Sequence, residues 1–217
     1  MKGLLIKDFK LVMIQKYALL VIVGVMSLMT FKSDNRVFAI AYMTFVGTLF
    51  ALSTISYDEA DNGNAFLFAL PISRRDYVAE KYLFGLLLGS GFWLFGTLLS
   101  VTAAMAVGGS RPAELMETAV LIFPLLFGLL ALMFPFQLKF GGERGRIAII
   151  AAIGLVCLVG VGIQKLGQLL HVDLAAMFRH LPGMSTGTVA ALAIGAGLVV
   201  LLISYRISVG IMNRKEF

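Results

Sequence analysis

The sequence predicts an all-α membrane protein that crosses the bilayer six times. Three observations carry this prediction: an apolar composition, apolar runs of spanning length, and basic residues gathered between alternate runs. Of the 217 residues, 59% are hydrophobic, and the mean hydropathy is +0.94. Only 14% are charged, whereas soluble domains carry about 25%. We therefore expect residues 1–217 to form a single transmembrane domain.

Six apolar runs are separated by polar segments. Most are close to the ~20 residues that an α-helix needs to cross ~30 Å of hydrocarbon. The first is short, although Leu11–Ile14 can extend it toward the N-terminus, and the third is long if its helix begins at Arg74. None contains a charged residue in its interior. The runs are Tyr17–Phe31, Val37–Ser56, Tyr82–Val107, Thr118–Leu138, Ile147–Ile163 and Thr188–Tyr205.

The basic residues orient the chain. Thirteen of the 18 Lys and Arg residues lie in the N-terminal tail, between runs two and three, between runs four and five, or at the C-terminal end. By the positive-inside rule these segments are cytoplasmic, and so are both termini. An even number of spans agrees with this arrangement. Because the charges are spread over short loops, the net charge of +6 does not indicate a nucleic-acid partner.

Two further segments show helical patterns outside the spans. In residues 1–16, Leu5, Phe9, Val12 and Met13 share one helical face, and Lys7, Asp8, Lys10 and Gln15 lie opposite. This segment is either an interfacial helix or the cytoplasmic start of the first span. Residues 164–187 repeat apolar residues at intervals of three and four, which predicts an amphipathic helix on the outer face. Its alternative role is to cap the bundle.

Glycine and proline predict local features of the spans. Gly85, Gly89 and Gly96 allow close approach of another helix, because small residues at that spacing let backbones meet. Pro124 and Pro135 interrupt the fourth run. A proline has no N–H to donate, so we expect a kink or a break there.

No catalytic, metal or nucleotide site is readable. The chain lacks the glycine-rich phosphate-binding motif G-x-x-x-x-G-K-[ST]. His171 and His180 lie nine residues apart on the predicted outer helix, which favours interfacial polar residues over metal ligands. Cys157 is the only cysteine. Ion-driven carriers usually place ionisable residues at membrane depth, so uncharged spans suggest that any driving energy enters from outside the membrane.

The polar segment between runs two and three is the best candidate for that entry. Residues 57–82, YDEADNGNAFLFALPISRRDYVAEKY, contain charges, a short apolar stretch and Pro71. Ser73 and Asp76 then form a capping-box pattern, which predicts the start of a helix. The apolar stretch can dock into a groove of a partner, or it can lie on the membrane surface.

Within this segment, one motif consists of Tyr57-Asp58-Glu59, Asn64, Leu70-Pro71-Ile72-Ser73-Arg74, Tyr77-Val78 and Lys81-Tyr82. Together with the start MKGLLIKDF, this motif resembles that of bacterial ABC type-2 transporter permeases. The resemblance is to the small six-span subgroup whose ATPase is a separate chain. It implies that the loop forms a coupling helix on two ATPase subunits, which bind ATP and Mg²⁺, and that the permease pairs with a second permease. It also implies a peptide or amphipathic substrate. The expected coupling residues are Asp58, Glu59, Asp61, Asn64, Phe66, Leu67, Phe68, Leu70, Pro71, Ser73 and Arg74.

Two other functions remain open at this point. One is a membrane-embedded immunity or regulatory protein that binds a toxic peptide without transporting it. The other is a carrier driven by an ion gradient. The expected localisation is the bacterial cytoplasmic membrane, where the chain contacts lipid.

Overall fold

A computed structural model describes residues 2–32, 35–60, 63–69, 71–141 and 186–215, together with residues 145, 147, 150 and 154. This described part contains helices and no strand. The helices are α1 (Lys2–Ile14), α2 (Lys16–Lys32), α3 (Arg36–Glu59), α4 (Gly63–Ala69), α5 (Arg74–Val107), α6 (Pro112–Phe140) and α9 (Thr186–Arg214).

The helices confirm the predicted all-α membrane fold. By length and composition, α3, α5, α6 and α9 can each cross a membrane, and the bent pair of α1 and α2 can supply a fifth span. The predicted run Ile147–Ile163 and the predicted outer helix at 164–187 fall almost entirely outside the described residues. The number six therefore stays a prediction.

Helix boundaries refine the predicted runs. α5 begins at Arg74 and has 34 residues, so at 1.5 Å per residue it is about 50 Å long and exceeds the hydrocarbon layer. α3 continues to Glu59. The connection between these helices therefore covers residues 60–73, which is shorter than the predicted loop of residues 57–82.

The N-terminal segment is a separate helix. α1 and α2 meet at an angle of 67°, so Leu11–Ile14 belong to α1 and are separated from the first predicted run by a bend. The buried residues of α1 are Leu4, Asp8 and Val12, which recur every four residues and face the bundle. Asp8 is therefore on the buried face, whereas the sequence pattern had predicted it on the polar one.

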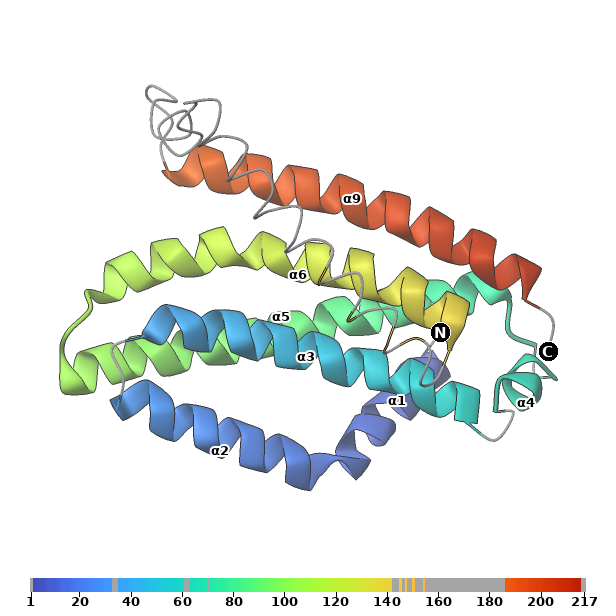
Figure 1. Cartoon of the computed structure of the whole chain (residues 1–217), viewed down its shortest axis with the longest axis horizontal. Helices are drawn as coiled ribbons and strands as arrows, with labels where there is room; N and C mark the ends of the chain where they lie inside the picture. The colour runs from blue at the N-terminus through green and yellow to red at the C-terminus, as the bar shows by residue number, and fades with distance from the viewer. Residues whose placement is uncertain are drawn as a thin grey trace.

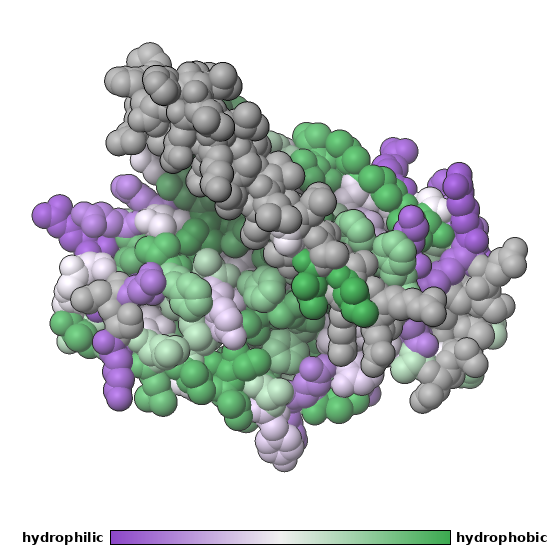
Figure 2. Space-filling model, viewed as in Figure 1, coloured by the Kyte–Doolittle hydropathy of each residue, from purple (hydrophilic) through white to green (hydrophobic). Residues whose placement is uncertain are grey.

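The core lies among α3, α5 and α6, and α9 packs along α6 (Figure 1). Phe134, Met133 and Ile55 are among its fully buried side chains. Large apolar side chains remain exposed on α2 and α9, including Leu28 and Leu202. In Figure 2 hydrophobic residues cover much of the middle of the visible face, and hydrophilic ones gather mostly toward its ends. This distribution suits a bundle surrounded by lipid.

Glycines create the close contacts of α5, as predicted. A Cβ at Gly85 would come within 2.8 Å of the Phe134 ring, and one at Gly89 would come within 2.2 Å of Leu126. Gly47 on α3 is also tightly packed against α5, because its Cβ would lie 2.8 Å from the Phe92 Cβ and 3.2 Å from the backbone of Gly89. The Gly85-x-x-x-Gly89 motif thus lies against α6, and Gly89 also lies against α3.

The prolines do not break α6, which runs unbroken from Pro112 to Phe140. Pro135 cannot donate a hydrogen bond to the carbonyl of Ala131, four residues earlier. The hydroxyl of Ser204 on α9 donates to that carbonyl at 2.7 Å, and the Tyr82 hydroxyl lies 2.7 Å from the same serine oxygen. An interhelical bond therefore replaces the lost helical one and joins α9 to α6 and α5.

Candidate coupling site

The short helix α4 packs against α3 and lies at the end of the bundle where α3 and α9 end (Figure 1). Leu67 is only 8% exposed and belongs to the core. Phe68 is half-buried, and its ring meets that of Tyr77 edge-on with centroids 5.6 Å apart. Phe66, in contrast, is 74% exposed. α4 is thus held by two side chains and presents the third to its surroundings.

The apolar residues of α4 differ in their exposure. Four of the expected coupling residues are apolar, namely Phe66, Leu67, Phe68 and Leu70. Of the three that the structure describes, Leu67 and Phe68 pack inward and Phe66 is exposed. A helix of 7 residues has two turns, so neighbouring positions necessarily face different sides. Asp61, Leu70 and the side chain of Asn64 lie outside the described residues.

The start of α5 confirms the predicted capping box. The Ser73 hydroxyl oxygen accepts a hydrogen bond from the Asp76 amide at 3.0 Å, and the hydroxyl donates to the Asp76 carboxylate at 2.6 Å. Pro71 precedes this cap and is exposed. Arg74 donates to the carbonyls of Met212 and Asn213 at 2.9 and 2.7 Å. It therefore binds carbonyls in the last turn of α9, where helical i+4 donors run out. The Met212 carbonyl also accepts from the Lys215 amide at 3.3 Å.

Asp58 and Glu59, two of the expected coupling residues, have cationic partners inside the chain. Glu59 forms an ion pair with Lys215 at 2.7 Å. Lys215 also donates to the carbonyl of Leu138 at 3.1 Å, so it joins the ends of α3, α6 and α9. Asp58 is buried, because α3 continues past the predicted end of its span and carries this residue into the bundle.

Asp58 belongs to a charge cluster, which we define as Lys7, Asp8, Asp58 and Lys81; all but the half-buried Lys7 are buried. Lys81 lies 2.7 Å from Asp58 and also pairs with Asp8. Lys7 pairs with Asp58 and lies 3.2 Å from Asp8. The cluster contains two cations and two anions, and it joins α1, α3 and α5.

Two hydroxyls complete the charge cluster. Thr54 donates to Asp8 at 3.1 Å, and Tyr77 donates to Asp58 at 3.2 Å.

Lys7 lies in α1, ahead of the first span. Burial alone would lower the pKa of Lys7, but the hydrogen bonds and charges of Asp58 and Asp8 outweigh this and raise it. Lys7 therefore remains a cation and keeps α1 attached to α3.

Sequence reasoning missed this cluster. The sequence pattern places Lys7 and Asp8 on the polar face of an interfacial helix, and it places Asp58 and Lys81 among the charged residues of a loop. The signal that could have revealed it is the spacing of Leu4, Asp8 and Val12, which puts an acid in the middle of an apolar stripe. A buried acid requires a nearby base.

The described residues contain no group of three or more His, Cys, Asp or Glu side chains that could hold a metal ion. The two histidines lie outside those residues.

Comparison with known families decides the class of the protein. A model described as ABC-2 family transporter protein matches residues 3–213. The chain belongs to the ABC-2 transporter family. Comparisons with curated proteins and with solved structures gave no significant match. This ABC-2 protein is thus the membrane component of a transporter, and the family implies that it works with an ATPase subunit.

Proposed function

We propose that this ABC-2 protein is the permease subunit of a bacterial ATP-driven exporter, and that α4 is the helix that couples it to a separate ATPase. The observation that carries the proposal is the exposure of Phe66. A large aromatic side chain that is 74% exposed on a short, anchored helix has the form of an anchor for an apolar groove.

The contacts behind α4 provide a route for force. Leu67 and Phe68 transmit a displacement of α4 to the core and to Tyr77. Tyr77 contacts Asp58, and the charge cluster extends from there to α1. Arg74 connects the start of α5 to the end of α9. A push on Phe66 therefore acts on four of the described helices together.

The rest of the assembly follows from this role. ATP and Mg²⁺ bind in the ATPase subunits, and both termini of the permease face the cytoplasm with α4. A second permease copy, or a similar permease, completes the transport unit. The substrate is a peptide or another amphipathic molecule that leaves the cell across the bacterial cytoplasmic membrane.

The test changes Phe66 and leaves the inward-facing residues intact. Phe66→Asp places a charge where an apolar contact is proposed, and Phe66→Leu is the matched control. An interface anchor contributes about 2 kcal/mol or more, which corresponds to a change of about thirtyfold or more in affinity. After mild solubilisation we therefore expect tagged Phe66→Asp to lose most of the ATPase that co-purifies with the wild type. Phe66→Leu should retain most of it.

Equal recovery of a nucleotide-binding ATPase chain with Phe66→Asp and with the wild type would refute the coupling role. Size-exclusion profiles of the variants provide the check on folding. Phe66 lies on the surface, so neither variant should alter the profile.

A further inference from the structure

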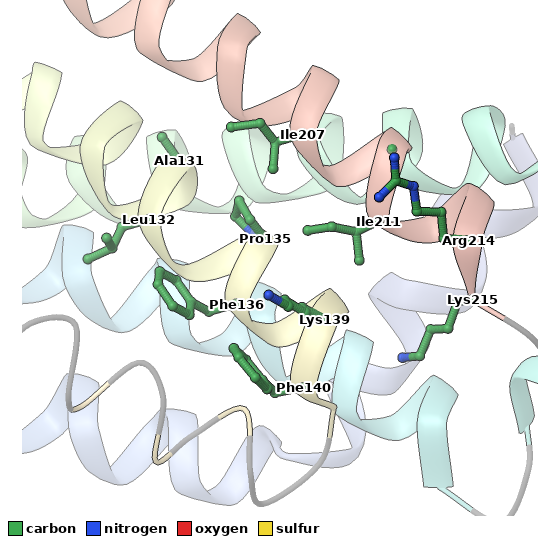
Figure 3. A pocket seen from close by; sticks show the side chains of 11 residues that line it. Ala131, Leu132, Pro135, Phe136, Lys139, Phe140, Ile207, Ile211, Arg214 and Lys215 are labelled. Atoms are coloured by element: carbon green, nitrogen blue, oxygen red, sulfur yellow. The ribbon is translucent and has the colours of Figure 1, made fainter.

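A pocket of about 810 Å³ lies between α6 and α9, on the side of α9 that carries Ile207, Ile211 and Arg214. Figure 3 shows its side chains. Leu132 lies toward one end of the view, Arg214 and Lys215 lie toward the other, and Ile207 and Lys139 lie between them. The pocket is therefore apolar at one end and cationic at the other.

Two of its cations have no ion-pair partner among the described residues. Lys139 and Arg214 are exposed, and neither forms an ion pair with a described residue. Lys215 is different, because it pairs with Glu59. The pocket thus presents two positive charges beside an apolar wall, which favours an anion with a hydrocarbon portion.

The dimensions fit such a ligand. Leu132 and Lys139 are seven residues apart on α6, so about 10 Å of helix separates the apolar end from the cationic one. Both helices end on this side of the molecule, beside α4. If α4 is cytosolic, as the proposed function requires, then the cations lie at the depth of lipid headgroups in the inner leaflet.

We propose that this pocket binds an anionic phospholipid, with its phosphate on Lys139 and Arg214 and its acyl chain along Leu132 and Ile207. Basic pockets between membrane helices on the cytoplasmic side bind anionic headgroups by this combination of charge and apolar contact. The lipid supports the contact of α6 with α9 at the cytoplasmic end, where the two helices flank the pocket. The inference rests on the proposed function only in placing the pocket in the inner, cytoplasmic leaflet of the membrane.

Gly210 allows the pocket to be filled without disturbing the fold. It lines the pocket, and a Cβ built on it meets no atom within 4 Å. Gly195 lies on the same helix outside the pocket, and a Cβ there also meets nothing within 4 Å. Gly210→Leu and Gly195→Leu therefore form a matched pair. Arg214→Gln is matched in turn by Arg206→Gln, because Arg206 is exposed on α9 and does not line the pocket.

The experiment titrates the purified full-length chain in detergent with phosphatidylglycerol, phosphatidylcholine or glycerol phosphate and measures binding by native mass spectrometry. We expect phosphatidylglycerol to bind the wild type more tightly than the other two. Arg214→Gln should weaken its binding about fivefold, the equivalent of roughly 1 kcal/mol for one basic residue near anionic lipid. Gly210→Leu should abolish the preference, while Gly195→Leu and Arg206→Gln keep it.

Three results would overturn the lipid site. These are equal binding of phosphatidylglycerol and phosphatidylcholine, binding of glycerol phosphate as tight as that of the lipid, or an unchanged preference in Gly210→Leu. Loss of the preference in both glycine variants would also count against the pocket. Because no ATPase is present, these outcomes are independent of the Phe66 test.

Discussion

Lys81 shows how much of this structure depends on single buried residues. Its ammonium group lies between Asp8 and Asp58 and is 1% exposed. A buried ion pair adds little net stability by itself, but removal of one partner leaves an uncompensated charge. The charge cluster is therefore better understood as a device that fixes α1 on α3 and α5. All four residues of the cluster can be identified as charged in the sequence. Their contact in the structure depends on the 67° bend after α1, which no local sequence pattern encodes.

Adjacent residues of α5 should respond to the same substitution with opposite signs. Lys81→Met leaves Asp8 and Asp58 without their shared cation, and we expect a loss of about 3–5 kcal/mol in the free energy of unfolding. Glu80 is also fully buried, but neither of its carboxylate oxygens has a hydrogen-bond partner among the described residues. Glu80→Met should therefore raise stability, because it removes a polar group that burial penalises. Thermal unfolding in detergent measures both effects.

Lys10→Met is the control for this pair, because Lys10 is exposed on α1. It should leave the unfolding temperature unchanged. If Lys81→Met unfolds at the same temperature as Lys10→Met, the charge cluster does not hold the N-terminal helix.

At the scale of helices, the sequence predicts best the position of the apolar helices, because composition alone determines it. The runs for α2, α3, α5, α6 and α9 were located, and Ser73 marked the start of α5. Two features depend on contacts with other helices and could not be predicted from the sequence. The Pro135 break is avoided because Ser204 of another helix takes over the carbonyl of Ala131. The inward orientation of Leu67 and Phe68 depends on the core and on Tyr77, against which these two residues of α4 pack.

Gly47 is a test of helix approach that the sequence did not single out. A Cβ on Gly47 would come within 2.8 Å of the Phe92 Cβ and 3.2 Å of the Gly89 Cα, and neither atom can move without the backbone of α5. Gly47→Ala should therefore cost about 1–3 kcal/mol, as other overpacked cores do.

Gly128→Ala on α6 is the matched control, because its Cβ meets nothing within 4 Å. It should be neutral or stabilising by up to about 1 kcal/mol, since alanine favours a helix over glycine. Equal unfolding temperatures for the two variants would show that α3 and α5 are not packed as closely as described here.

At the scale of the whole molecule, one end of the bundle gathers every feature assigned to the cytoplasm. α4, the charge cluster, the Glu59–Lys215 pair and the α6–α9 pocket all lie there. The positive-inside rule predicts this side from the sequence, because it depends only on where basic residues fall between apolar runs. The identity of the contacts at this end came only from the packing of helices distant in the sequence.

The central claim is that α4 presents Phe66 to an ATPase in the cytosol. The most direct measurement is labelling of Phe66→Cys, in a Cys157→Ala background, with a membrane-impermeant thiol reagent. We predict no labelling in intact cells, labelling in inverted membrane vesicles stripped of the ATPase, and protection when the ATPase is bound again. Labelling of intact cells, or labelling of the vesicles that the bound ATPase leaves unchanged, would contradict this account.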